Sequence, residues 1–142
     1  MAVTDERYGF HFEYRMCGAR PTILDLLHKD TETLTKGDLV NLESGELDLA
    51  ATGDTAILGA VKETGAGTDS TTRKKVIVDA DAVYSVYDAN ARLAGATLDI
   101  DGATGAMTVA ATSNADLIVV AESTATQRTL VMINHDAHAW LS

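Results

Sequence analysis

The residues nearest the C-terminus carry the side chains best suited to metal binding. His135, Asp136 and His138 place two imidazoles and a carboxylate close together, and these groups are natural ligands of zinc and nickel. Histidines three residues apart share a face only when the segment is helical, and the single cysteine, Cys17, is remote in the sequence. We therefore expect no metal ion here, and no other cofactor.

A second oxygen-rich segment, LDIDGATG at residues 98–105, contains the beginning of a calcium-loop pattern. A complete loop also needs further oxygen ligands and a glutamate several positions later. Position 110, where that glutamate would fall when counted from Asp99, is alanine. Strand alternation predicts that Asp99 and Asp101 face solvent on the same side, so we interpret both as surface residues.

Nucleophilic catalysis would require a serine or cysteine within hydrogen-bond reach of a base. Ser85 or Cys17 with His28 are the candidates, but nothing in their spacing connects them. The sequence also lacks a GxSxG elbow, a GxxxxGK[ST] phosphate loop and a GxGxxG turn after a strand. We expect no catalytic residues and a protein that is not an enzyme.

The aromatic residues are concentrated near the N-terminus. In YGFHFEY, residues 8–14, every second position is aromatic, which predicts a strand with one aromatic face. The segment is either an edge strand of the domain's own sheet or an arm that adds a strand to a neighbouring subunit. The predicted interface residues are Tyr8, Phe10, Phe12, Tyr14 and, as a large aromatic residue near the C-terminus, Trp140.

The elements that would position these residues are short strands separated by glycine and acidic turns. Segment 23–27 suits a helical turn or a strand equally well, 64–72 reads as an exposed loop, and 88–96 as a short helix or turn. Strands are predicted within 39–49, 56–62, 75–87, 97–100, 107–111, 117–121 and 130–133, with turns at 43–46, 52–54 and 101–105. The fold class is mainly β, a small β-barrel or β-sandwich of the β-tulip kind with short helical turns, in which 1–20 form an extended arm and 21–142 one domain.

The net charge of the chain and the length of its apolar segments limit the kinds of partner that it can bind. The chain has 142 residues with 11 Lys and Arg against 21 Asp and Glu, a formal net charge of −10, which disfavours nucleic acid. Arg73, Lys74 and Lys75 are the one basic cluster, and we interpret them as a solvated strand end. No apolar run is long enough to span a membrane, and the acidic start MAVTDERYGF is unlike a secretory signal. We expect synthesis in the cytoplasm and partners that are proteins.

Taken together, KGDLVNLESGELDLAATGDTAILGAVKETGAG, VIVDADAVYSVYD, ARLAGATLDIDG and NADLIVVAES resemble the head-decoration, or capsid cement, proteins of tailed bacteriophages over roughly residues 34–133. The resemblance implies a β-rich, trimeric virion protein on the outer capsid surface, which stabilises contacts between major capsid protein subunits. The alternatives are another phage virion subunit, such as a tail-tube or head-completion protein, and a small metal- or ligand-binding β-barrel that uses His135 and His138.

Overall fold

The computed structural model describes residues 8–30, 32–67, 72–88, 90–102, 104–111, 114–123 and 127–140. Within these ranges the chain forms antiparallel β-sheets and one short 3-10 helix, η1 (His135–Ala137). None of the described helical structure is long and apolar enough to cross a membrane. The mainly β fold predicted from the sequence is confirmed, with sheets that stay open rather than closing into a barrel.

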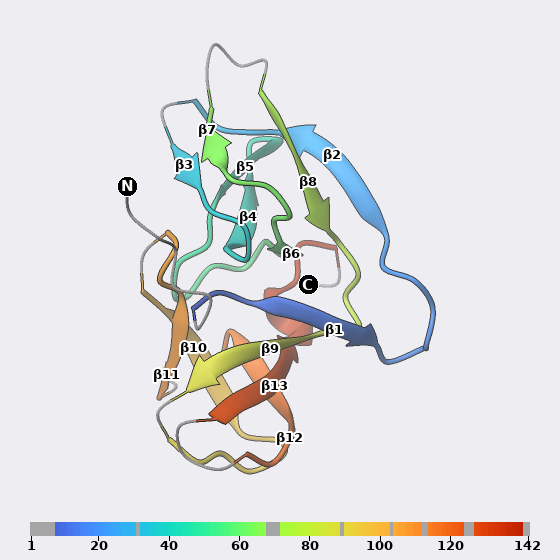
Figure 1. The fold of residues 1–142 in the computed structure, drawn as a ribbon, viewed down its shortest axis with the longest axis vertical. Helices are drawn as coiled ribbons and strands as arrows, with labels where there is room; N and C mark the ends of the chain where they lie inside the picture. The colour runs from blue at the N-terminus through green and yellow to red at the C-terminus, as the bar shows by residue number, and fades with distance from the viewer. Residues whose placement is uncertain are drawn as a thin grey trace.

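The described strands form four sheets. The largest has the strand order β1 (His11–Arg15), β9 (Ala82–Asp88), β13 (Gln127–Ile133), β12 (Leu117–Ala121), β10 (Thr97–Asp101) and β11 (Thr108–Ala111). The smaller sheets are β5 (Glu46–Leu49) with β4 (Leu39–Glu43) and β6 (Ile57–Ala60), β2 (Ile23–Leu27) with β8 (Arg73–Ile77), and β3 (Thr33–Leu34) with β7 (Gly65–Ala66). Figure 1 shows the six-stranded sheet below and the smaller sheets above. β1, the edge strand of the large sheet, lies on the side of the smaller sheets.

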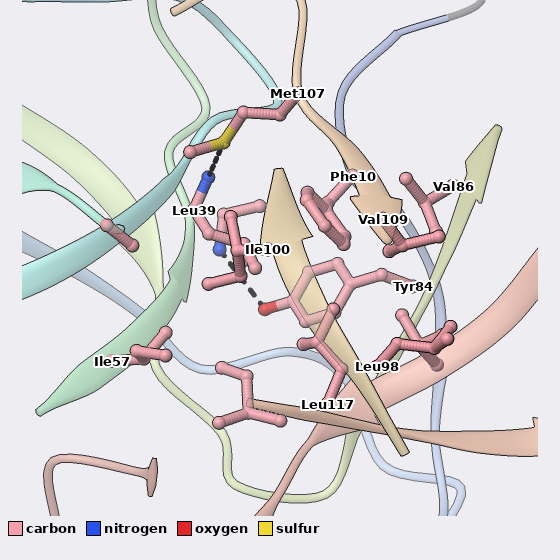
Figure 2. Packing of buried hydrophobic residues seen from close by; sticks show 14 of the residues in the cluster. Phe10, Leu39, Ile57, Tyr84, Val86, Leu98, Ile100, Met107, Val109 and Leu117 are labelled. Atoms are coloured by element: carbon pink, nitrogen blue, oxygen red, sulfur yellow. Dashed lines mark hydrogen bonds between the residues drawn. The ribbon is translucent and has the colours of Figure 1, made fainter. Parts of the chain in front are cut away.

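The main core lies against the inner face of the six-stranded sheet. This sheet curls, so that β11 comes close to β9. Just before β1 and β11, the Gly9 N–H donates to the Met107 carbonyl at 2.9 Å. Tyr84 lies at the centre and is fully buried, with its hydroxyl accepting a hydrogen bond from the Ala60 N–H at 3.3 Å. The Met107 sulfur accepts a hydrogen bond from the Leu39 N–H, and Figure 2 shows both bonds among the packed side chains.

A second, smaller core lies among the short sheets above. Its buried members are Leu34, Val40, Leu47, Leu58, Val61, Val76 and Val78. On β4, Leu39 belongs to the main core and its neighbour Val40 to the second core. On β6, Ile57 belongs to the main core and Leu58 to the second core. Because successive side chains of a strand point to opposite faces, β4 and β6 separate the two cores and contribute to both.

Two of the predicted turns, 43–46 and 101–105, join antiparallel strands into hairpins. β4 and β5 are joined by Ser44 and Gly45, whose φ angles are 51° and 83°. Two central residues with positive φ form the turn that matches the natural twist of antiparallel strands, and glycine adopts this conformation without steric cost. β10 and β11 pair as predicted, with Ile100 opposite Val109.

Buried aspartates hold the loops in place. The Asp38 carboxylate is fully buried and accepts hydrogen bonds from the Thr35 N–H, the Thr104 hydroxyl and the Gly105 N–H at 2.8, 2.6 and 3.0 Å. Asp99 was expected on the surface, but it is only 6% exposed. Its carboxylate accepts the N–H groups of residues 114 and 115, and these bonds compensate for its burial.

Other local predictions are corrected or resolved. Segment 23–27 is the strand β2. Within the predicted loop 64–72, Gly65–Ala66 pair with β3, while 68–71 lie outside the described residues. Segment 88–96, predicted as a short helix or turn, contains a turn at 94–95 and no helix in its described part, and position 89 lies outside it. Lys74 was predicted to be solvated but is only 7% exposed, because strand alternation directs its side chain inward. The side chain packs against Gly65, which has no side chain of its own.

Candidate functional site

The predicted aromatic strand belongs to the chain's own sheet. His11 lies opposite Ser85 and Phe12 opposite Tyr84 in the antiparallel pair of β1 with β9. Of the two interpretations of residues 8–14, the structure therefore shows the edge strand and not an arm on a neighbouring subunit. The prediction of a separate arm over 1–20 includes residues 1–7, which lie outside the described residues.

The four aromatic side chains do not share one exposed face. Phe10 is 2% exposed, and its ring packs edge-on against that of Tyr84, with the ring centroids 6.5 Å apart. Phe12 packs on the same tyrosine from 6.2 Å. The prediction that Phe10 is an interface residue is thus wrong, because the chain's own core already covers this ring.

The two outer aromatic residues are more accessible. Tyr8 is partly buried beside Tyr87, with ring centroids 6.2 Å apart. A bulge between Phe12 and Tyr14 interrupts the regular register, and a bulge ends the strict alternation of side chains. Tyr14 is 42% exposed and is available to a partner.

Polar contacts fasten both ends of β1. Arg128 on β13 donates to the Ser85 carbonyl at 2.6 Å and to the Gly9 carbonyl at 3.3 Å. At the other end, the Arg15 guanidinium donates to the Asp81 carboxylate at 2.8 Å, and this hydrogen bond raises the pKa of Arg15. The edge strand is held by the fold before any partner is present.

A cleft of about 670 Å³ runs beside β1. It is lined by Tyr8, Phe10, His11, Phe12, Thr35, Lys36, Gly37, Ala60, Val61, Lys62, Thr64 and Ile77. Consecutive residues of a strand point to opposite faces, so a hollow lined by three consecutive residues, 10–12, follows the edge of the strand rather than a face of the sheet. Three of the five predicted interface residues meet here.

The charged side chains of this cleft are basic, in contrast to the chain as a whole. Lys36 and Lys62 are exposed, as is His11, and none of the described lining residues is acidic. Sequence reasoning missed both lysines, since they lie 22 or more positions beyond the aromatic segment and no local pattern connects them to it.

Trp140, the fifth predicted interface residue, lies at a separate hollow of about 490 Å³. Its indole is 52% exposed, and its backbone N–H donates to Nδ1 of His138 at 3.2 Å. Arg15 borders the same hollow. This residue therefore stays a candidate for contact with a partner, at a place distinct from the cleft.

The groups considered for chemistry are dispersed. His138 is buried, whereas the side chains of His135 and Asp136 are 68% and 97% exposed, and burial lowers the pKa of His138. Among the described residues no group of three or more His, Cys, Asp or Glu is placed to hold a metal ion.

The three candidates for nucleophilic chemistry also have separate surroundings. The Cys17 N–H donates to Asp81, and the Ser85 hydroxyl donates to Glu13 at 2.7 Å. His28 is buried next to β5, where its backbone bridges to Leu47. Ser85 thus pairs with the Glu13 carboxylate, and both ring nitrogens of His28 lack a hydrogen-bond partner among the described residues, so the structure brings neither Ser85 nor Cys17 into a hydrogen bond with His28.

Comparisons with known proteins give one informative similarity. No protein-family model and no curated protein matches the sequence. Among solved structures, the fold is similar to the crystal structure of the head fiber gp8.5 N base in bacteriophage phi29, with a TM-score of 0.52 and 15% sequence identity. The similarity covers 82% of this chain and 98% of that chain. At this identity the two proteins are alike in fold, and the fold of the present chain is that of a domain found at the base of a phage head fiber.

Proposed function

We propose that this chain is a structural protein of a tailed-phage head, which attaches to the outer surface as a decoration protein and contacts the major capsid protein. The observation that carries the proposal is the similarity in fold to the head fiber base, which extends over 98% of that chain. The sequence resemblance of residues 34–133 to decoration proteins supports the same assignment. In this proposal the protein acts by binding alone, and catalysis, a cofactor, nucleic acid and a membrane play no part. The protein is synthesised in the host cytoplasm and then attaches to the head.

Two exposed aromatic side chains are the proposed contacts to the capsid. Tyr14 and Trp140 are 42% and 52% exposed, and aromatic residues of this kind dominate the binding energy of many interfaces. We assign a trimeric state to the protein, in which each subunit presents these residues. Three weak contacts on one particle then reinforce one another through their high effective concentration.

The test combines light scattering with binding to heads that lack the protein. The purified chain is expected to have the mass of a trimer and to co-sediment with undecorated heads. Trp140→Ala should weaken attachment by about tenfold, as expected for an interface hot spot. Leu93→Ala is the matched control, because Leu93 is 72% exposed and is not among the proposed contacts. A protein that remains in the supernatant at all concentrations would refute the proposal.

A second candidate function is the anchoring base of a head fiber, which the same similarity in fold favours. The two functions differ in where and how often the protein occurs on the particle. Electron microscopy of reconstituted heads distinguishes them, because a protein that stabilises contacts between major capsid subunits should be spread over the whole head surface, whereas a fiber base should occur only where fibers project. Ring-shaped assembly in solution would instead favour a tail-tube or head-completion subunit.

A further inference from the structure

The cleft beside β1 has the shape required for an extended peptide. Its volume of about 670 Å³ lies within the range of known ligand sites, roughly 300–1,000 Å³. One wall is the segment from Tyr8 to Phe12 and the other includes 60–62. Each wall consists of residues close together in the sequence, Tyr8 and 10–12 on one side and 60–62 on the other, so the cleft runs along two backbone segments.

The β1 wall offers backbone hydrogen bonds to an occupant. β1 is the last strand of its sheet, and its outer edge pairs with no other strand of the described chain. Alternate residues of an edge strand direct N–H and C=O groups away from the sheet. On the opposite wall, the N–H groups of Val61 and Lys62 already donate to the backbone carbonyls of Asp38 and Lys75, at 2.9 and 2.8 Å. The Phe10 N–H, just before β1, likewise donates to the Gly37 carbonyl at 2.7 Å. A peptide in the cleft would therefore bond to β1 itself, from His11 onward.

The charges in the cleft specify the kind of peptide. Lys36, Lys62 and His11 line it, in a chain whose formal net charge is −10. We infer that the cleft binds an extended acidic segment of another protein, which adds to the edge of β1 as a further strand. Its carboxylates pair with the two lysines, and its apolar side chains contact Tyr8 and Phe12, so that main-chain bonds give affinity and side chains give selectivity.

This inference depends on the cleft alone and does not require the capsid function. A second copy of the chain is the competing occupant, and the oligomeric state of the lysine variants distinguishes it from another protein. Arg15 at the end of β1 and Arg128, which bonds to Gly9 just before β1, already hold this strand in place, so binding needs no rearrangement of the fold.

The first test measures fluorescence anisotropy of a labelled peptide of about six residues with alternating valine and glutamate, long enough to lie along β1 at about 3.3 Å per residue. The full chain is expected to bind it, and to ignore the equivalent peptide of valine and lysine. The double variant Lys36→Glu, Lys62→Glu should bind about tenfold more weakly, since two exposed ion pairs become repulsive. Arg20→Glu makes the same type of charge change at an exposed residue outside the cleft and should bind normally.

A second test examines the strand addition itself. N-methylation of alternate peptide amides removes donors on one side of an extended chain. One set of alternate positions should weaken binding by about tenfold and the other set should be tolerated, because only one set faces β1. In amide NMR spectra, the signals of His11 to Tyr14 should shift on binding.

Three results would overturn the inference. The first is no binding of the valine–glutamate peptide at millimolar concentration, and the second is unchanged affinity of the double lysine variant. The third is self-association in light scattering, as dimer or trimer, that the double variant abolishes, which would identify a second copy as the occupant. Circular dichroism verifies that each variant is folded, and both lysines are exposed, so their replacement leaves the core intact.

Discussion

Replacing Phe10 with alanine tests whether β1 is part of the folded domain. The ring is 2% exposed and packs against Tyr84 and the rest of the main core. Removing a buried phenylalanine side chain costs about 3–5 kcal/mol, a large part of the roughly 5–15 kcal/mol that stabilises a typical domain. At an m value of about 1.5 kcal/mol/M, a loss of about 4 kcal/mol lowers the urea midpoint by roughly 2–3 M.

The measurement is urea unfolding followed by tryptophan fluorescence and circular dichroism, with Tyr14→Ala as the control. Tyr14 lies on β1, four residues beyond Phe10, but is 42% exposed, so its replacement should cost about 1 kcal/mol or less. Equal midpoints for the two variants would refute the reasoning. They would mean that the aromatic segment is detached from the core in solution and acts as a free arm.

Three further predictions concern the interior. Gly59→Ala should lower stability by about 1–3 kcal/mol, measured by thermal unfolding, because a Cβ at this position would overlap the Ile77 carbonyl and press on the Tyr84 hydroxyl. Asp38→Ala should cost roughly 3 kcal/mol, since it removes a charged acceptor from three hydrogen bonds; a change below 1 kcal/mol in urea unfolding would show that water replaces the carboxylate. Burial and the charge of Lys74 lower the pKa of His28 in the folded protein. As the pH drops below about 6.5, His28 therefore takes up a proton in the unfolded chain before it does so in the folded one, and stability falls. His28→Gln should reduce this acid dependence in denaturation curves recorded from pH 7 to pH 5, and an unchanged pH profile would contradict the assignment.

The strand pattern could be predicted where short-range rules apply. Glycine turns such as Ser44-Gly45 and alternating segments such as 97–101 fix hairpins through neighbouring residues, and both hairpins were found. The segment 75–87 was predicted as strand interrupted by Asp79 and Asp81, and β8 and β9 lie on either side of these aspartates.

The environment of each strand could not be predicted in the same way. Period-two alternation shows which side chains share a face, but not whether another part of the chain covers that face. Phe10 is therefore in the core rather than at an interface, and Asp99 is buried under the N–H groups of residues 114 and 115. The cleft was missed for the same reason, because it forms only when 35–37 and 60–64 meet β1.

The position of β4 and β6 between two cores has a consequence for how the protein unfolds. Each strand buries one face in the main core and the other in the second core, so neither core can be exposed without removing side chains from its neighbour. We expect a single cooperative transition, with equal calorimetric and van't Hoff enthalpies. Partly opened forms should be scarce, which gives proteases few sites of attack below the global transition. If the chain is the virion component proposed above, this resistance to local opening would protect it outside the cell.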